Sequence, residues 1–293
     1  MDQGGVGEFE AERARLLAVA YRMLGSAAEA EDAVQDTFLR WNAADRGAVR
    51  NPAAWLTKVL TNLCSTRLAS ARARRESYIG PWLPEPVATA DSAFGPLDTA
   101  ELRESVSMAF LLLLERLTPP ERAVFVLREA FEYSHREIAE ILDLTEANCQ
   151  QLYRRARLRV TQDRPRFTAS RDEGGRIARR FLSAAQGGDI AGLQSLLAED
   201  VVAWADGGGR TPAARKPVRG ADRVSRYLTS WMSRDIPGLE VRITEVNGQP
   251  GLLAIVGGEL LIAGVLDVVE GRITAIRIVT NPDKLGFLAA QLV

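Results

Sequence analysis

Side chains that could read DNA bases are concentrated within ten residues near the middle of the chain: Asn148, Gln150, Gln151, Arg154, Arg155 and Arg157. A Gln side chain can form two hydrogen bonds with adenine, and Arg can bond guanine or a phosphate. The apolar residues among them keep the spacing of one helix face: Cys149, Tyr153, Ala156 and Val160. A helix buried on that face would offer amides and arginines to the major groove of DNA. A solvated amphipathic hairpin in a helical bundle explains the same spacing.

A shorter helix is expected just before this one. Ser134 and Glu137 have the spacing of a capping box, which begins a helix, and Thr145 can cap the longer helix after a short turn. The two helices together predict a helix-turn-helix. His135, the only histidine, lies at the beginning of the first helix, where it either touches phosphate or is exposed without a function.

Three consecutive glycines between Asp206 and Arg210 suggest a phosphate cradle. Such a cradle needs a glycine-rich turn that opens directly into a helix. Here the glycines follow a strand-like run and lead into a segment with two prolines, which disfavours a cradle. What remains is a surface loop whose Asp206 and Arg210 contact another part of the chain, or a mobile hairpin tip with no partner.

Acid–base chemistry has weak support in the C-terminal part of the chain. Asp206, Asp222 and Asp267 are the candidate general bases, but this part has no histidine, no paired carboxylates and no cluster with the spacing of a metal site. We therefore predict no catalytic residue, no metal and no cofactor. Three aromatic residues could line a ligand pocket or form part of the core: Trp204, Tyr227 and Trp231.

The chain has 293 residues, 46% of them hydrophobic and 26% charged, which is typical of a globular protein. Its formal net charge of −1 means that DNA binding must rest on local basic patches, such as the six arginines against one aspartate in residues 153–166. The two cysteines, Cys64 and Cys149, fall in apolar helical patterns and are expected in the core. The N-terminus lacks an apolar signal segment, and the most apolar tract, 251–269, is interrupted by charges and glycines. We expect a cytoplasmic protein without a membrane span.

Changes in residue periodicity divide the chain. Helical patterns up to residue 76 are followed by a Pro-rich linker, and helical patterns then resume until about residue 160. After a polar boundary, two or three helices lead into alternating runs, separated by Asn-Gly, Gly-Gly and Glu-Gly turns, that predict an antiparallel sheet. The fold class is multidomain: two all-α helical domains (8–77 and 98–165) joined by a linker (78–97), and an α+β domain (174–293).

Two helical motifs resemble the sigma-70 family of RNA polymerase sigma factors. TPPERAVFVLREAFEYSHREIAEILDLTEANCQQLYRRARLRV resembles region 4, which reads the −35 promoter element, and EAEDAVQDTFLRW with NPAAWLTKVLTNLCSTRLASARARRE resembles region 2 of the small extracytoplasmic-function members. The resemblance implies promoter-specific transcription initiation. Its partners would be the core polymerase, through the β′ clamp helices and the β subunit, and promoter DNA.

The resemblance also implies roles for individual residues. In region 4, Gln150, Gln151 and Arg154 would face bases, and Asn148, Arg155 and Arg157 would contact phosphate. In region 2, Asn62 would bind a flipped −10 base, and the phosphate contacts would be Arg67, Arg72, Arg74 and Arg75. The polymerase-binding residues would be Asp32, Gln35, Asp36, Phe38 and Leu39, although an ordinary core-plus-solvent helix face explains that pattern too.

The C-terminal tail resembles the cone-shaped SnoaL-like domain that is fused to one subgroup of these factors. Three motifs strengthen the match: WLPEP in the linker, DGGGR, where family members usually have Lys in place of Arg210, and NPDKL. They imply interdomain regulatory residues: Trp82, Asp206, Gly207, Gly208, Gly209, Arg210, Asn281, Pro282, Asp283, Lys284 and Leu285. We expect the tail to regulate the factor in cis, in a chain that is monomeric when free. The alternative is a SnoaL-like enzyme or ligand sensor, with a small-molecule ligand, that carries a DNA-binding extension.

Overall fold

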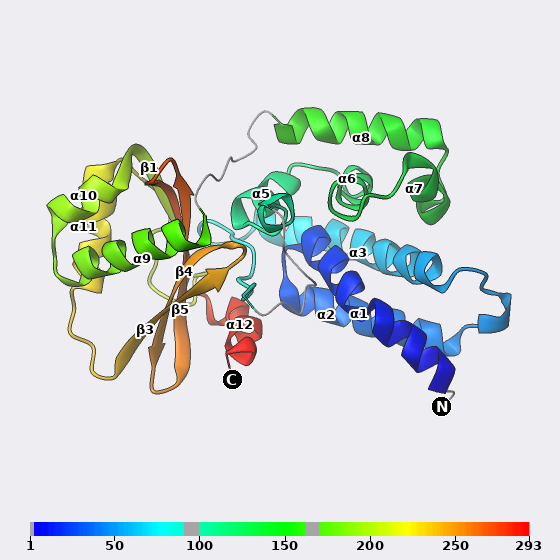
Figure 1. Cartoon of the computed structure of the whole chain (residues 1–293), viewed down its shortest axis with the longest axis horizontal. Coiled ribbons are helices and arrows are strands. Elements are labelled where there is room, and N and C mark those ends of the chain that lie inside the picture. Colours follow the sequence, from blue (N-terminus) through cyan, green and yellow to red (C-terminus); the bar gives the residue numbers. More distant parts are fainter. Residues whose placement is uncertain (1–2, 91–99, 162–169, 293) are drawn as a thin grey trace. The chain divides into compact units, whose positions relative to one another are not determined.

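The computed structural model describes residues 3–90, 100–161 and 170–292, apart from the side chains of residues 3–5, 72–74, 100–101 and 161. The chain forms two compact units (Figure 1). The helical unit comprises residues 1–76 and 92–164, and the sheet unit comprises residues 77–91 and 165–293. Most of the Pro-rich linker therefore folds with the sheet unit, although in sequence it joins the two halves of the helical unit.

The helical unit has two groups of helices. The first group is α1 (Gln3–Leu24), α2 (Ala27–Ala43), the short 3-10 helix η1 (Arg46–Ala48) and α3 (Pro52–Glu76). The second group is α4 (Ala100–Glu104), α5 (Met108–Leu114), α6 (Pro119–Phe131), α7 (His135–Leu142) and α8 (Glu146–Thr161). Helices α1, α2 and α3 pack on one another, as do α6, α7 and α8, and α3 also contacts α6 and α7. The two groups thus share one core.

A buried ionic cluster lies where these two groups meet. Arg122 of α6 is 1% exposed and donates to the backbone oxygen of Arg22 at 3.0 and 3.2 Å and to Glu115 at 2.5 Å. Glu115 also pairs with Arg75 of α3. Burial lowers the pKa of Arg122 to about 9 and that of Arg22 to about 10, because it disfavours the charged guanidinium. The Glu115 carboxylate offsets part of this cost for Arg122 by pairing with it.

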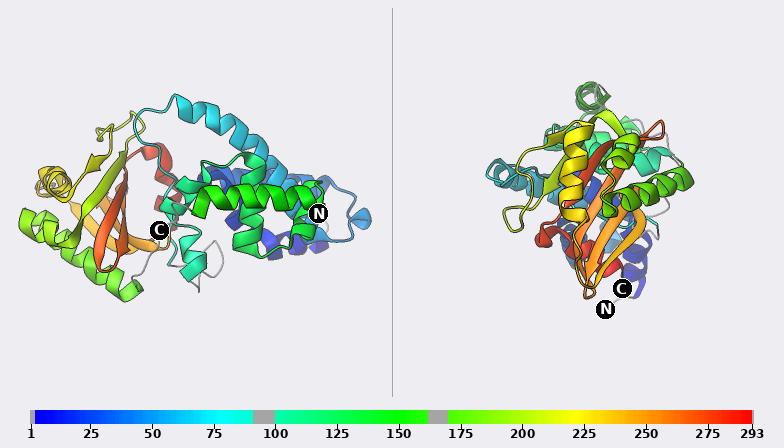
Figure 2. Two further views of the ribbon diagram at one scale, coloured as in Figure 1. Left: turned by 90° about the horizontal axis from the view of Figure 1, so that it is seen from above. Right: turned by 90° about the vertical axis from the view of Figure 1, so that its left-hand side faces the viewer.

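The sheet unit combines a six-stranded sheet with helices. Its elements are α9 (Arg171–Gln186), α10 (Ile190–Leu196), β1 (Leu197–Asp206), β2 (Val218–Arg219), α11 (Ala221–Met232), β3 (Leu239–Val246), β4 (Gln249–Val256), β5 (Glu259–Val269), β6 (Arg272–Val279), η2 (Pro282–Lys284) and α12 (Gly286–Gln291). The strand order is β2-β1-β6-β5-β4-β3. Helix α9 packs on β3 and β4, and α11 packs on β1, so both cover one face of the sheet (Figure 2). The predicted fold class, helical domains followed by an α+β domain, is confirmed.

One strand pairing differs from the sequence-based expectation of an antiparallel sheet. Strands β3, β4, β5 and β6 are antiparallel, but β1 pairs with β6 in parallel, with Trp204 opposite Arg277. Consecutive strands joined by tight turns must be antiparallel. Strand β1 is separated from β6 by β2, α11 and the strands β3, β4 and β5, so turn signals alone did not determine its direction.

Candidate functional site

The structure forms the helix-turn-helix from the local signals in the sequence. Ser134 and Glu137 make a reciprocal capping box at the beginning of α7, and Thr145 Oγ1 accepts a hydrogen bond of 3.2 Å from the Asn148 N–H at the beginning of α8. The buried side of α8 carries Cys149, Ala156 and Val160, which are at most 1% exposed. Helix α8 is therefore fixed by one face only.

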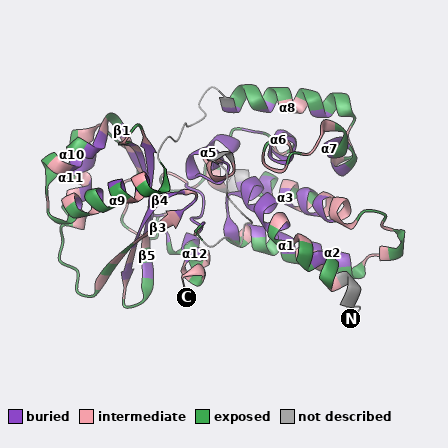
Figure 3. Cartoon of the chain, viewed as in Figure 1, coloured by how far each residue is buried: buried purple, intermediate pink, exposed green. Residues whose placement is uncertain are grey.

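The other face of α8 carries the predicted DNA-reading residues, all of them exposed (Figure 3): Asn148, Gln150, Gln151, Arg154, Arg155 and Arg157. Tyr153 Oη donates to Glu129 at 2.6 Å and Arg159 pairs with Glu121 at 2.6 Å, which ties α8 to α6. His135 is half-buried, with its ring 5.2 Å from that of Tyr153. A rigid helix with exposed amides followed by arginines fits major-groove binding.

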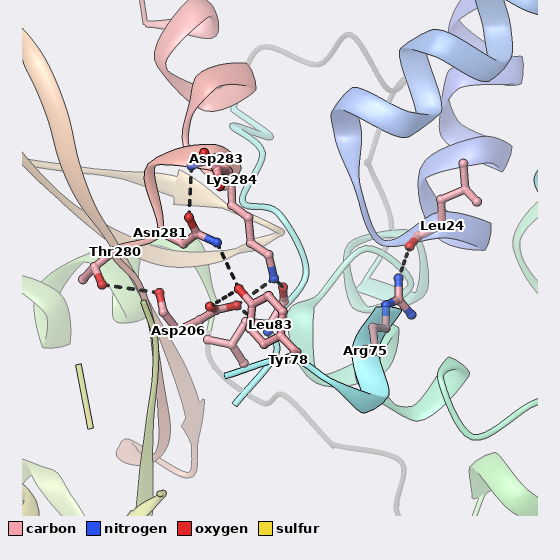
Figure 4. A network of polar contacts seen from close by, with 9 residues as sticks. All are labelled: Leu24, Arg75, Tyr78, Leu83, Asp206, Thr280, Asn281, Asp283 and Lys284. Carbon is pink, nitrogen blue, oxygen red and sulfur yellow. Dashed lines mark hydrogen bonds and ion pairs between the residues drawn. The ribbon is translucent and has the colours of Figure 1, made fainter. Parts of the chain in front are cut away.

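The predicted −10 residues on α3 have different surroundings. Asn62 is exposed, and Arg75 donates to the backbone oxygen of Leu24 at 2.9 Å (Figure 4) besides pairing with Glu115. Arg67 pairs with Asp36 at 2.7 Å and with Asp32 at 3.7 Å. The side chains of Arg72 and Arg74 lie outside the described residues. Arg67 thus pairs with two carboxylates that the sequence assigned to polymerase binding.

Three of the five predicted polymerase-binding residues of α2 border a hollow of about 330 Å³ between α1 and α2. Asp32, Gln35 and Phe38 line it, and the Phe38 ring lies 4.8 Å from that of Phe9. Leu39 is 58% exposed. An exposed large apolar side chain beside carboxylates and a hollow suits a protein partner.

A group of polar contacts attaches the linker to the sheet unit (Figure 4); we call the cluster of Tyr78, Leu83, Asp206, Asn281 and Lys284 the linker clamp. At its centre the Asp206 carboxylate is fully buried at the end of β1. It accepts hydrogen bonds from Tyr78 Oη at 2.5 Å, the Leu83 N–H at 2.8 Å and Lys284 Nζ at 2.7 Å. One carboxylate thereby holds two points of the linker.

Lys284 is the cationic partner in the clamp. Its Nζ also donates to the Leu83 backbone oxygen at 2.6 Å and lies 4.4 Å from the ring centre of Trp82 and 4.8 Å from that of Tyr78. The Lys284 side chain is 9% exposed, so both charges of the pair are desolvated and depend on each other. Burial, followed by the hydrogen bond to Asp206, raises the pKa of Tyr78, which keeps the phenol protonated as a donor.

Two of the three glycines of the DGGGR motif, Gly208 and Gly209, lie against the same contact. Gly208 and Gly209 have φ values of 56° and 73°, which L side chains rarely adopt. A Cβ on Gly208 would clash with the Asn281 amide and lie 2.9 Å from Tyr78 Oη, and one on Gly209 would lie 2.9 Å from Ile79 Cδ1. The glycines therefore let the linker approach the loop, which is a more specific role than flexibility.

Gly208→Ala is expected to destabilise the sheet unit by about 2–4 kcal/mol, because the left-handed conformation costs about 1–2 kcal/mol and the new methyl group displaces Tyr78 and Asn281. Gly257→Ala is the matched control: its φ is 59°, yet nothing lies within 4 Å of the added Cβ. It should cost only the conformational part. Hydrogen exchange of the strand amides measures both, and equal effects would contradict a close approach of the linker.

Further contacts continue the attachment along the linker. Val87 and Asn247 exchange two hydrogen bonds, Val87 N–H to Asn247 Oδ1 at 3.1 Å and Asn247 N–H to Val87 O at 2.9 Å. Gln291 of α12 bonds both backbone groups of Ala88, at 2.8 and 3.2 Å. Sequence reasoning missed Tyr78, Asn247 and Gln291, because the Asn-Gly pair at 247–248 predicts only a hairpin turn.

Arg210 pairs with Asp283 on the surface of the same unit. Two parallel bonds of 3.1 Å join the guanidinium to the carboxylate, with side chains 62% and 59% exposed. The planar fork of Arg allows this two-bond geometry, which Lys cannot reproduce. The pair connects the DGGGR and NPDKL motifs, but its exposure makes it worth little stability.

The three aspartates considered for catalysis have structural partners. Asp206 belongs to the clamp, and exposed Asp222 pairs with Arg226 of its own helix. Asp267 pairs with Arg277, burial raises its pKa, and the guanidinium lies 5.2 Å from the Trp204 ring centre. Within the described residues, no group of three potential metal ligands is found, and no helix is long and apolar enough to cross a membrane.

Comparison with known proteins finds matches in both units of the chain. Family profiles described as Sigma-70 region 2, Sigma-70 region 4 and SnoaL-like domain match residues 9–74, 107–160 and 178–276. The ECF RNA polymerase sigma factor SigJ of Mycobacterium tuberculosis is 38% identical over 95% of this chain and 92% of its own length. The probable ECF sigma factor SigI of the same organism is 33% identical over 97% and 96%. The crystal structure of SigJ aligns with a TM-score of 0.75 at 35% identity, covering 96% of this chain and 98% of that one.

Proposed function

Since the chain belongs to the extracytoplasmic-function sigma factors of the sigma-70 family and carries a fused SnoaL-like domain, we propose that the sheet unit regulates, in cis, the promoter-specific initiation that the helical unit directs. Membership of the family confirms the resemblance drawn from the sequence. It makes the chain a transcription factor that works with RNA polymerase and promoter DNA. The relatives point to a regulator rather than an enzyme.

We further propose the residue roles on the DNA-binding and polymerase-binding surfaces. Gln150, Gln151 and Arg154 of α8 read −35 bases, and Asn148, Arg155 and Arg157 position the helix on phosphates. Asn62 reads a −10 base. The nearby phosphates of the DNA backbone are contacted by Arg67, Arg72, Arg74 and Arg75. The polymerase contacts are Asp32, Gln35, Asp36, Phe38 and Leu39. Exposure of the six α8 side chains and of Asn62, and the hollow beside α2, support this assignment.

Gln151→Ala should weaken binding to the cognate −35 element by about 1–3 kcal/mol and relax sequence choice, because it removes base contacts. Arg155→Ala is the matched comparison, since both residues are exposed on α8. It should weaken binding equally for matched and scrambled DNA and reduce the slope of log K against log salt by about 1. Fluorescence anisotropy of both variants as polymerase holoenzymes gives these numbers, and identical behaviour of the two would refute the division of roles.

The observation that carries regulation in cis is the attachment of the linker by buried Asp206. Residues 77–91 lie in sequence between region 2 and region 4, yet they fold with the sheet unit. Regions 2 and 4 must reach two separate promoter elements, so whatever holds the linker influences which arrangements the two regions can adopt. A tethered domain acts at high effective concentration, and a modest attachment energy is enough to shift that equilibrium.

Run-off transcription with truncated chains tests this proposal. A chain ending at Leu285 keeps Asp206 and Lys284 but loses Gln291, and a chain ending at Arg164 loses the whole folded SnoaL-like domain. Each should differ from the full chain by at least about fivefold in yield, the lower range of allosteric coupling. Unchanged activity in both truncations would overturn regulation in cis.

We also propose that the sheet unit has no catalytic activity and that the free factor is a cytoplasmic monomer. Each nominated aspartate is engaged by a structural partner, which supports the first part. Incubation of the full chain with small carbonyl compounds, followed by mass spectrometry, tests this, because any turnover would appear as a product of changed mass.

A further inference from the structure

A large apolar side chain, Leu158, lies on the outer face of α8 and takes no part in the helical core. It is 60% exposed, and its neighbours along the chain, Arg157 and Arg159, are exposed as well. A single exposed leucine is ordinary on a protein surface, so its position on the helix decides what it can do.

Helical geometry puts Leu158 at the centre of the outer face. The buried side of α8 carries Cys149, Ala156 and Val160. At about 100° per residue, Leu158 lies about 160–180° from all three around the helix axis, and within about 20° of Gln151. Leu158 and Gln151 therefore point in nearly the same direction from α8.

Leu158 is also close enough to Gln151 to reach bases in the same groove of DNA. Seven residues of helix rise about 10 Å, which corresponds to about three base pairs. On the recognition helices of homeodomains, side chains seven positions apart both contact base edges. A helix that places Gln151 in the major groove thus brings Leu158 against that groove too.

An apolar side chain has one suitable partner among the base edges of the major groove. Adenine, guanine and cytosine present hydrogen-bond donors and acceptors there, and thymine presents a C5-methyl group beside its acceptor. Against a donor or acceptor, Leu158 would displace water without replacing its hydrogen bonds, which is unfavourable. Contact with the methyl group instead removes apolar surface of both partners from water, which is favourable.

The charges around Leu158 favour DNA over a protein as the molecule that covers it. Four exposed arginines lie within four positions of Leu158: Arg154, Arg155, Arg157 and Arg159. Such a basic surface complements the phosphate backbone of DNA. Leu39 of α2 differs in this respect, because it follows the carboxylate of Asp36 by three positions on its helix.

We propose that Leu158 is a further specificity-determining residue of region 4, which reads the methyl group of a thymine about three base pairs from the base that Gln151 contacts. The proposal rests on the assignment of α8 to the −35 element. It adds to that assignment a preference for one T·A pair, at a defined distance, through a side chain that forms no hydrogen bond.

Replacement of thymine by uracil tests the proposal, because uracil keeps the pairing with adenine and lacks only the C5-methyl group. Polymerase holoenzyme with the full chain is titrated, by fluorescence anisotropy, with promoter duplexes in which each thymine of the −35 element is replaced in turn. At one position, binding should weaken about fourfold, the effect of one buried methyl group. That position should lie about two to four base pairs from the one at which Gln151→Ala relaxes sequence choice.

Three variants assign the methyl contact to its side chain. Leu158→Ala should no longer distinguish thymine from uracil at this position, and it should melt like the unaltered chain, because Ala is the best helix former and the site is exposed. Gln151→Ala, on the same side of α8, should weaken binding but keep the fourfold difference. Leu261→Ala removes a 42% exposed leucine from β5 and should keep both the affinity and the difference.

The outcomes separate this proposal from the function on which it rests. A difference between thymine and uracil that persists in Leu158→Ala, or no such difference at any position, would overturn the reading of a methyl group, even where Gln151→Ala confirms that α8 reads the −35 element. Weaker binding of Leu158→Ala to core polymerase, with an unchanged response to uracil, would overturn it in favour of a protein contact. If neither α8 variant altered −35 binding, the assignment of α8 would fall together with the proposal.

Discussion

Asp206→Ala should lower the free energy of unfolding of the sheet unit by about 3–5 kcal/mol and release the linker. Lys284 would remain as a buried cation without its carboxylate, and breaking a buried pair from one side carries a cost of this size. Tyr78 and the Leu83 N–H would also lose their acceptor. Hydrogen exchange on the full chain measures both effects: the strand amides report stability, and the Leu83 amide reports attachment of the linker.

Asp283→Ala is the matched control for this change. Asp283 is also an aspartate paired with a cation in the same group of motifs, but it and Arg210 are more than half exposed. Its loss should cost at most about 1 kcal/mol and leave the Leu83 amide protected. If the two variants destabilised the unit equally, burial of the Asp206 pair would not be what holds the linker.

The second large effect is expected in the helical unit, from Glu115→Ala. Glu115 neutralises Arg122, whose side chain is 2% exposed, and also pairs with Arg75 across the two groups of helices. Without it the helical unit should lose about 3–5 kcal/mol, because the buried guanidinium keeps only its bonds to the Arg22 backbone oxygen. Exchange of amides in α6 should accelerate accordingly.

Glu140→Ala provides the comparison for Glu115→Ala. Glu140 pairs with Arg136 on the surface of α7, and the two side chains are 69% and 80% exposed. Its removal should change stability by no more than about 0.5 kcal/mol. A similar small effect at Glu115 would mean that Arg122 is stabilised by its backbone contacts alone.

Local signals made much of the helical unit predictable. The capping box at Ser134 and the apolar spacing from Cys149 to Val160 both act within a few turns of helix. The sequence alone therefore indicated α7, α8 and the exposed face of α8. The same reasoning recognised the hairpins of the sheet, because Asn-Gly and Gly-Gly turns are short-range features.

Contacts between distant residues could not be predicted in this way. Tyr78 and Asp206 are separated by 128 positions and Ala88 and Gln291 by 203, and no periodic pattern links either pair. The sequence singled out the glycines but not what they approach, since a positive φ and a close neighbour become visible only when the linker is in place. The parallel pairing of β1 with β6 escaped prediction for the same reason.

The pairing of Arg67 with Asp32 and Asp36 is another contact that the sequence did not predict. The sequence placed the arginine on a DNA surface and the two aspartates on a polymerase surface, as separate sets. Because α2 packs on α3, the side chains meet at 2.7 and 3.7 Å. Two surfaces that are assigned from separate motifs can therefore contact each other once the helices are packed.

Run-off transcription by a double-mutant cycle at the clamp tests regulation in cis most directly. Asp206→Ala and Lys284→Met break the same buried pair from opposite sides, so each should change the yield in the same direction by at least about fivefold. The double variant should change the yield by no more than a single one, because the interaction can be lost only once and the double variant leaves no unpaired buried charge. Yields within twofold of the unaltered factor in all three variants, with the Leu83 amide shown by exchange to be released, would contradict the account.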